Sequence, residues 1–210
     1  MTSDEPIEIA GERGVVAGRF TSSRTGGPAG DGRAVLLVGG ADGGFEGPAE
    51  ALYPTLVEDF AARGIASLRV DFRLHRFPND VEEGVHDLLA GIEWLEARGA
   101  RRIVLVGHSF GGAVVIEGGV RSSTVAGVVT LATQTAGAQR VDLLSPRPIL
   151  LIHGRDDTRL SPRCSEMLHE AAGESKQLAI PDGATHSLRQ AREDVRTRVL
   201  TWVDEVLGTS

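Results

Sequence analysis

The chain has 210 residues but only one cysteine, Cys164, and only 4% of its residues are aromatic. A single cysteine excludes an intramolecular disulfide, so a reducing compartment is the simpler expectation. No apolar run approaches the roughly 18 residues that a transmembrane helix needs. The acidic residues 1–6 also lack the apolar core of a signal peptide. The sequence therefore predicts a cytoplasmic protein that does not enter a membrane.

Sequence motifs for metals and nucleotides are missing as well. There is no His-Glu-x-x-His, Cys-x-x-Cys or paired-histidine pattern, and no glycine-rich phosphate-binding motif of the P-loop or dinucleotide type. The formal net charge of −7 disfavours nucleic acid, which binds basic faces with aromatic stacking platforms. We therefore expect no metal, no cofactor and no nucleic-acid partner.

The composition is that of an ordinary globular protein, with 41% hydrophobic and 24% charged residues. The length fits one domain over residues 1–210. Residues 7–20 predict two antiparallel strands joined near Glu12 and Arg13. Residues 21–33, which are rich in Ser, Thr, Gly and Pro, predict a mobile surface loop and not a linker between domains.

Strand-like and helix-like segments alternate along the rest of the chain. Apolar runs are found at 34–38, which is typical of a strand buried on both faces, and at 148–153, and further strands are predicted at 65–70, 102–106, 125–131 and 176–180. Helical patterns follow at 49–63, from Asn79 to near Gly99, after the strand at 102–106, from Ser161-Pro162, and at 190–207. This alternation predicts an α/β fold with a mostly parallel sheet and helices on both faces, in which ligands bind at the carboxyl ends of the strands.

One strand-to-helix junction carries the pentapeptide Gly107-His108-Ser109-Phe110-Gly111. A Gly-x-Ser-x-Gly sequence between a strand and a helix is the pattern of a nucleophile elbow, a sharp turn that exposes the serine. Because glycine-rich turns also occur in nucleotide-binding folds, the interpretation needs an acid and a histidine further along the chain.

Both residue types follow predicted strands. Asp156 and Asp157 follow the strand at 148–153, and His186 follows the strand at 176–180. The order serine, aspartate, histidine is that of α/β-hydrolases. The glycine-dense residues 39–44 favour an oxyanion loop, where a backbone N–H must approach a reacting carbonyl closely, over a plain tight turn.

Other polar residues are interpreted as structural. The remaining histidines, His75, His86, His108, His153 and His169, are assigned no chemical role. The charged group Arg69, Asp71, Arg73, His75 and Arg76 is interpreted as a salt-bridge network, with recognition of a substrate carboxylate as the alternative.

The chain resembles the α/β-hydrolase superfamily over nearly its whole length. The resemblance is carried by Gly-His-Ser-Phe-Gly at 107–111, His-Gly-Arg-Asp-Asp-Thr-Arg-Leu-Ser-Pro at 153–162 and Gly-Ala-Thr-His at 183–186. It implies that Asp157 is the acid, with Asp156 as the alternative, and that the N–H groups of Ala41 and Phe110 form the oxyanion hole. It also implies an α/β-hydrolase fold.

Within the superfamily the chain is similar to the small dienelactone-hydrolase-like branch. Residues 132–147 are too few to form a lid domain, so we expect an open site. A dienelactone hydrolase has a cysteine nucleophile where this chain has Ser109, which disfavours dienelactone as the substrate.

The resulting functional prediction is a serine hydrolase that cleaves small carboxylic esters through an acyl-enzyme, using Ser109, Asp157 and His186. The same residues would serve a thioesterase, an acyltransferase or a lactonase. A ligand-binding protein of the hydrolase fold with little turnover is the alternative outside catalysis.

Overall fold

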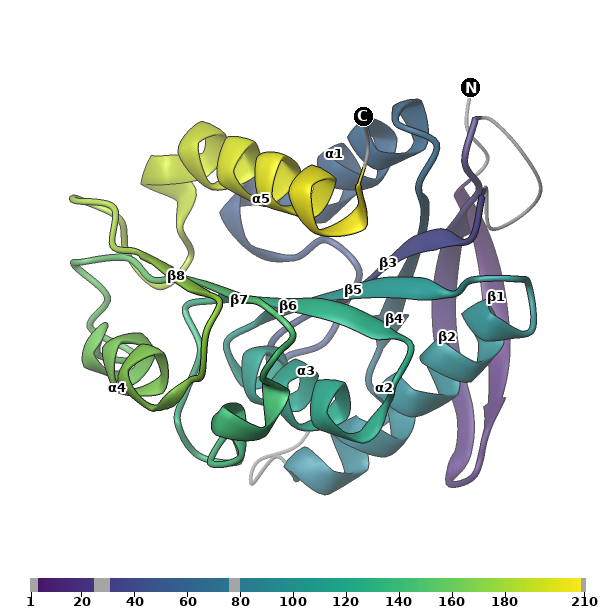
Figure 1. Ribbon diagram of the computed structural model, residues 1–210, viewed down its shortest axis with the longest axis horizontal. Helices are drawn as coiled ribbons and strands as arrows, with labels where there is room; N and C mark the ends of the chain where they lie inside the picture. The colour runs from purple at the N-terminus through teal and green to yellow at the C-terminus, as the bar shows by residue number, and fades with distance from the viewer. Residues whose placement is uncertain (1–3, 25–30, 76–79, 209–210) are drawn as a thin grey trace.

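The strands form one eight-stranded sheet (Figure 1). The computed structural model describes residues 4–24, 31–75 and 80–208. In spatial order the strands are β1 (Asp4–Gly11), β2 (Gly14–Thr21), β4 (Ala66–Asp71), β3 (Arg33–Val38), β5 (Arg102–His108), β6 (Val125–Leu131), β7 (Ile149–Ile152) and β8 (Lys176–Ala179). The α/β-hydrolase fold that the sequence predicts, with a mostly parallel sheet, is therefore confirmed.

The sheet changes from antiparallel to parallel at β4. β1 and β2 form a hairpin joined at Glu12 and Arg13, as predicted, and β2 runs antiparallel to β4. All the remaining pairs are parallel. Parallel neighbours need long crossover connections, and the helices between the strands provide them.

Helices cover both faces of the sheet (Figure 1). The helices are α1 (Pro48–Ala62), α2 (Val81–Glu96), α3 (Phe110–Arg121), α4 (Arg163–Ala171) and α5 (Arg192–Leu207). Side chains alternate along β3, so that Val35 and Leu37 join the core under α1 and α5, while Leu36 and Val38 join the core with α2 and α3. Burial on both faces explains why residues 34–38 of β3 are continuously apolar.

The start of α2 differs from the sequence prediction. The helix begins at Val81, with Asp80 as its N-cap residue, because the Asp80 carboxylate accepts a hydrogen bond from the Glu82 N–H at 2.9 Å. The predicted start, Asn79, lies outside the described residues, as do 25–30 of the predicted surface loop.

The parallel strands place four connections at one edge of the sheet. Residues 39–47 follow β3, Ser109 follows β5, residues 153–162 follow β7 and residues 180–188 follow β8. The connection from β6 to β7 carries only a short 3₁₀ helix, Val141–Leu144, and no lid domain. The edge where the sequence predicts chemistry is therefore not covered by an inserted domain.

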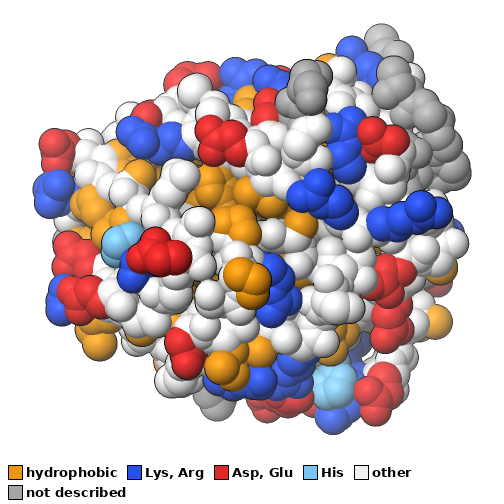
Figure 2. All heavy atoms as spheres, viewed as in Figure 1, with side chains coloured by type: hydrophobic (Ala, Val, Ile, Leu, Met, Phe, Trp, Pro, Cys, Tyr) orange, Lys and Arg blue, Asp and Glu red, His pale blue; other side chains and the backbone are white. Residues whose placement is uncertain are grey.

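On the face shown in Figure 2, basic and acidic side chains are interspersed around smaller groups of apolar side chains. Within the part of the chain that the structure describes, no helix has both the length and the apolar character needed to cross a bilayer.

Candidate active site

The turn between β5 and α3 has the strained backbone of a nucleophile elbow. Ser109 has a φ of 54° and a ψ of −116°, a region that non-glycine residues rarely adopt. A Cβ atom at Gly107 would overlap the carbonyl of Gly111, and one at Gly111 would overlap the carbonyl of Gly39. Both flanking positions therefore require glycine, and the turn holds Ser109 at the end of β5.

Three side chains from separate loops form a hydrogen-bonded chain at this edge. The Ser109 Oγ lies 3.0 Å from His186 Nε2, and His186 Nδ1 lies 2.7 Å from Asp157 Oδ2. A carboxylate only accepts hydrogen bonds, so Nδ1 carries the proton and Nε2 is left to accept one from the Ser109 hydroxyl. The structure therefore brings Ser109, His186 and Asp157 together in the geometry of an activated nucleophile.

The carboxylate of Asp157 is buried, and both of its oxygens accept hydrogen bonds. Its Oδ1 accepts hydrogen bonds from the backbone N–H groups of Arg159 and Leu160 at 2.8 and 2.9 Å. Burial raises the pKa of this carboxyl, but the hydrogen bonds from Leu160, His186 and Arg159 outweigh it, so that the pKa lies below its ordinary value. Asp157 thus stays negative beside His186. Asp156, the alternative acid, is exposed.

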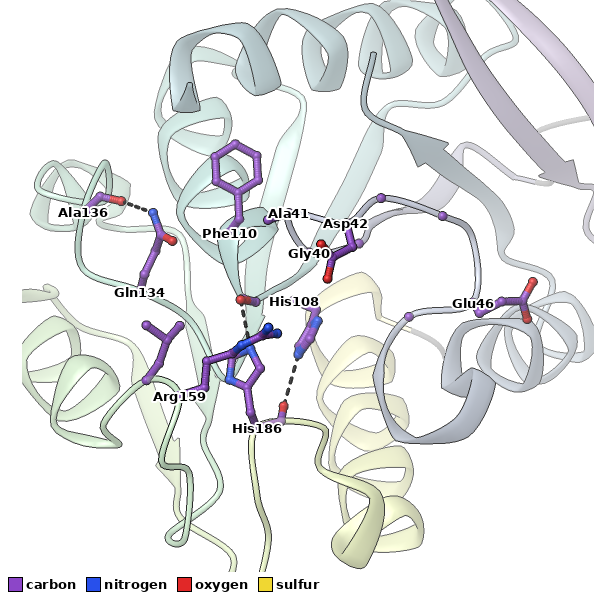
Figure 3. A pocket seen from close by; sticks show the side chains of 16 residues that line it. Gly40, Ala41, Asp42, Glu46, His108, Phe110, Gln134, Ala136, Arg159 and His186 are labelled. Atoms are coloured by element: carbon purple, nitrogen blue, oxygen red, sulfur yellow. Dashed lines mark hydrogen bonds between the residues drawn. The ribbon is translucent and has the colours of Figure 1, made fainter. Parts of the chain in front are cut away.

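The glycine-rich loop after β3 lies against the elbow. A Cβ atom at Gly40 would lie 3.5 Å from the Ser109 Cβ and 3.3 Å from the His108 Nδ1. Ala41 from this loop and Phe110 from the elbow line the same cavity as Ser109 and His186. Figure 3 shows Gly40 and Ala41 beside the elbow, across the cavity from Gln134 and Arg159.

Two side chains of β4, Asp71 and Arg69, form hydrogen bonds with this loop. The Asp71 Oδ1 accepts a hydrogen bond from the Gly44 N–H at 2.7 Å, and His75 Nε2 lies 2.8 Å from the same oxygen. Arg69 donates to the carbonyl oxygen of Phe45 at 3.1 Å. The loop is therefore held through one backbone N–H group, that of Gly44, and one backbone carbonyl, that of Phe45.

The cavity in front of Ser109 has a volume of about 620 Å³. This volume lies in the range of small-molecule sites. Its lining combines loop backbone with a few polar or apolar side chains, among them Asp42, Glu46, Gln134, Arg159 and Leu160. Among the described residues, no group of three or more His, Cys, Asp or Glu side chains is arranged to hold a metal ion.

Comparison with known proteins identifies the family. Residues 34–204 match the alpha/beta hydrolase family. The chain belongs to this family. A segment of 107 residues is also 35% identical to the uncharacterized protein YfhR of Escherichia coli (strain K12), covering 40% of this chain and 38% of YfhR. The match thus spans well under half the length of that relative.

Solved structures of this hydrolase fold superpose over almost the entire chain. Dienelactone hydrolase from Anabaena variabilis has a TM-score of 0.83 at 18% identity and covers 98% of each chain. Est1E from Butyrivibrio proteoclasticus has a TM-score of 0.80 at 16% identity, covering 97% of this chain and 99% of that one. The protein is therefore an alpha/beta hydrolase of dienelactone-hydrolase-like architecture.

His153, which was assigned no chemical role from the sequence, contacts Asp157 in this hydrolase. The side chain is fully buried, and its Nε2 lies 3.1 Å from Asp157 Oδ2 and 3.0 Å from the Leu160 carbonyl oxygen. Both partners are acceptors, so Nε2–H donates, and Nδ1 accepts from the Ser165 hydroxyl at 2.8 Å. Burial lowers the pKa of His153 and keeps it neutral. A neutral His153 therefore orients Asp157 without adding a positive charge to the site.

His108, the variable residue of the elbow, is also placed against the site. Its ring lies 5.1 Å from the His186 ring, and its Nε2–H donates to the His186 carbonyl oxygen at 3.2 Å (Figure 3). Burial lowers the pKa of His108 to about 4, against the opposing effect of that hydrogen bond. A neutral His108 fixes the backbone of His186 without repelling a positive charge on its ring.

The charged group at the end of β4 forms structural contacts. Arg69 pairs with Asp4 at 2.7 Å, and Arg73 pairs with Glu83 at 2.8 Å and with Asp87. Neither arginine is among the residues that line the cavities beside Ser109. The salt-bridge network is thus the arrangement found for these side chains, while Arg76 lies outside the described residues.

Proposed function

We propose that this hydrolase is a serine esterase that cleaves small carboxylic esters through an acyl-enzyme intermediate. The observation that carries the proposal is the continuous hydrogen-bonded chain Ser109–His186–Asp157, which opens on a cavity lined by a glycine-rich loop. The absence of a lid domain between β6 and β7 leaves this cavity accessible, which favours short acyl esters over long lipids.

In the proposed reaction, Ser109 Oγ attacks the ester carbonyl while its proton passes to His186 Nε2. Collapse of the tetrahedral intermediate breaks the ester bond, and His186 returns the proton to the departing alcohol. Water then attacks the acyl-enzyme in the same way and releases the acid. Asp157 holds the imidazole tautomer and stabilises the imidazolium throughout.

The oxyanion of each tetrahedral intermediate would be stabilised by the backbone N–H groups of Phe110 and Ala41. Both residues line the cavity beside Ser109. One such donor is worth roughly 3–4 kcal/mol in the rate of related reactions, or about 10²–10³-fold. Backbone donors keep this stabilisation independent of side-chain identity at position 41.

The test is covalent labelling followed by kinetics. A fluorophosphonate probe should add one label to the intact protein, and Ser109→Ala should not be labelled and should lose almost all hydrolysis of para-nitrophenyl acetate and butyrate. Ester cleavage that survives Ser109→Ala unchanged would overturn the proposal. Labelling without ester turnover, but with turnover of thioesters or lactones, would replace the ester assignment.

Two adjacent aspartates give a matched pair for the acid. We expect Asp157→Asn to lower kcat by about 10⁴-fold, since the amide favours the wrong imidazole tautomer. Asp156→Asn should retain the rate of the unmodified enzyme, because Asp156 is exposed and the carboxylate that bonds His186 is that of Asp157. Equal losses in the two variants would contradict the assignment of Asp157.

A further inference from the structure

Two cavities meet at His186. The first, in front of Ser109, is lined by Phe110 and the glycine-rich loop. The second has a volume of about 500 Å³, and its lining includes Glu50, Arg159 and the loop around His186. Gly47, His108, Arg159 and His186 thus line both cavities, while Ser109 and Phe110 line only the first.

Arg159 is unusual because its guanidinium has no partner in the described part of the chain. Apart from Arg101, every other described arginine donates to a carboxylate, a backbone carbonyl or a hydroxyl. The Arg159 backbone N–H is engaged with Asp157, so the fold fixes the residue while its side chain stays unpaired. Figure 3 shows this side chain beside His186 at the cavity.

The chemistry of the proposed function assigns the two cavities to the two halves of an ester. The departing oxygen must lie against His186 Nε2, because that nitrogen returns the proton. The carbonyl oxygen must lie toward the N–H groups of Phe110 and Ala41. A leaving group that continues past His186 therefore enters the second cavity, and passes Arg159 as it does so.

The other charges favour an anion on the leaving-group side. Asp42 and Glu46 line the first cavity and give this side a negative charge, since neither side chain has an ion pair among the described residues. They oppose a negative acyl group. The second cavity is lined by one carboxylate, Glu50, and this side chain is paired with Arg189 at 2.9 Å.

We propose that Arg159 selects esters whose alcohol portion carries an anionic oxygen group, a carboxylate in the simplest case, bound in the second cavity. A guanidinium presents two parallel N–H donors to a carboxylate and stays charged at all working pH values. This inference rests on the proposed esterase function and specifies its leaving group.

The experiment compares two esters with the same acetyl group, para-acetoxybenzoate and its methyl ester, in the full-length protein. The ratio of their kcat/KM values should fall about tenfold in Arg159→Gln, a change of about 1.4 kcal/mol. Arg159→Lys should keep part of the ratio, since it keeps the charge but not the fork. Arg101→Gln is the matched control and should keep the full ratio. Added salt should lower the ratio of the unmodified enzyme.

Two results would overturn the inference while leaving the esterase function intact. One is turnover of both esters with the same ratio in the unmodified enzyme and in Arg159→Gln. The other is an Arg159-dependent preference for an anionic acyl group, measured with para-nitrophenyl hemisuccinate against para-nitrophenyl valerate. Failure to hydrolyse any of these esters would instead overturn the proposed function, and this inference with it.

Discussion

His108 makes the stability of the protein depend on pH. Its pKa is lowered to about 4 in the folded protein from an ordinary value of 6.5. Between these values the unfolded chain binds more protons than the folded one, so the free energy of unfolding rises with pH. We expect about 3 kcal/mol of stability, fully present above pH 6.5, to be lost as the pH falls to about 4.

The measurement is urea unfolding at about pH 7 and about pH 4.5, compared between the unmodified protein and His108→Gln. A glutamine can still donate to the His186 carbonyl but does not titrate. The variant should therefore lose less stability on acidification, although His153, whose pKa is also lowered by burial, still contributes to the loss. Identical losses in the two proteins would contradict the prediction.

Chain order made some single residues predictable. Ser109 and His186 could be selected because each follows a different strand, while the position after 148–153 left Asp156 and Asp157 both open. The resemblance at 153–162 favoured Asp157, and the structure places Asp157 in contact with His186, and His186 in contact with Ser109. His108 and His153 could not be selected by that criterion. The His108 contact to the His186 carbonyl spans 78 residues, and only the packed fold reveals it. For His153 a signal existed, since it opens the motif at 153–162.

At the scale of elements, side chains of β4 hold the glycine-rich loop at 39–47 in place by hydrogen bonds. Removing the carboxylate in Asp71→Ala leaves the Gly44 N–H without its 2.7 Å acceptor and leaves His75 without its hydrogen-bond partner. Because displacing a catalytic donor by about 1 Å can cost about 10²-fold, we expect kcat for esters to fall by about 10- to 100-fold with little change in KM.

Steady-state kinetics on a para-nitrophenyl ester would test this expectation. Asp194→Ala is the control, because Asp194 forms an exposed ion pair with Arg198 within α5, far along the chain from the loop. A rise in KM with an unchanged kcat would show that the loop binds substrate without stabilising the transition state.

Elements were easier to predict than their ends. The central strands β3 and β7 could be recognised because burial on both faces favours a run of apolar side chains. Helix starts depend on which polar side chain reaches a backbone N–H, and several neighbours qualify. Asp80 caps α2, while α4 begins at Arg163 after the predicted Ser161-Pro162. The last helix likewise follows a 3₁₀ turn at Arg189–Ala191 and begins at Arg192.

At the scale of the whole molecule, one chain of contacts joins the N-terminal hairpin to the proposed oxyanion loop. Asp4 on β1 accepts from Arg19 at 2.8 Å and from Arg69 at 2.7 Å, and Arg69 in turn donates to the Phe45 carbonyl. Burial raises the pKa of Asp4, but its bonds to Arg69 and Arg19 outweigh it and lower the pKa overall. The antiparallel hairpin therefore neutralises a guanidinium that is buried beside the site.

Asp4→Ala should therefore act on both stability and activity. Arg69 is only 2% exposed, so loss of its carboxylate partner leaves a buried charge that water cannot solvate. Asp4 itself is about one third exposed, which limits the cost to about 1–3 kcal/mol in the free energy of unfolding. A decrease in kcat should accompany it, because Arg69 is then free to shift away from Phe45.

The neighbouring Glu5→Ala is the control, since Glu5 is exposed and forms no ion pair among the described residues. Urea unfolding and ester kinetics on both variants separate the effects. If Asp4→Ala lost stability but kept the full kcat, the hairpin would support the sheet alone, and the proposed oxyanion loop would be held without it.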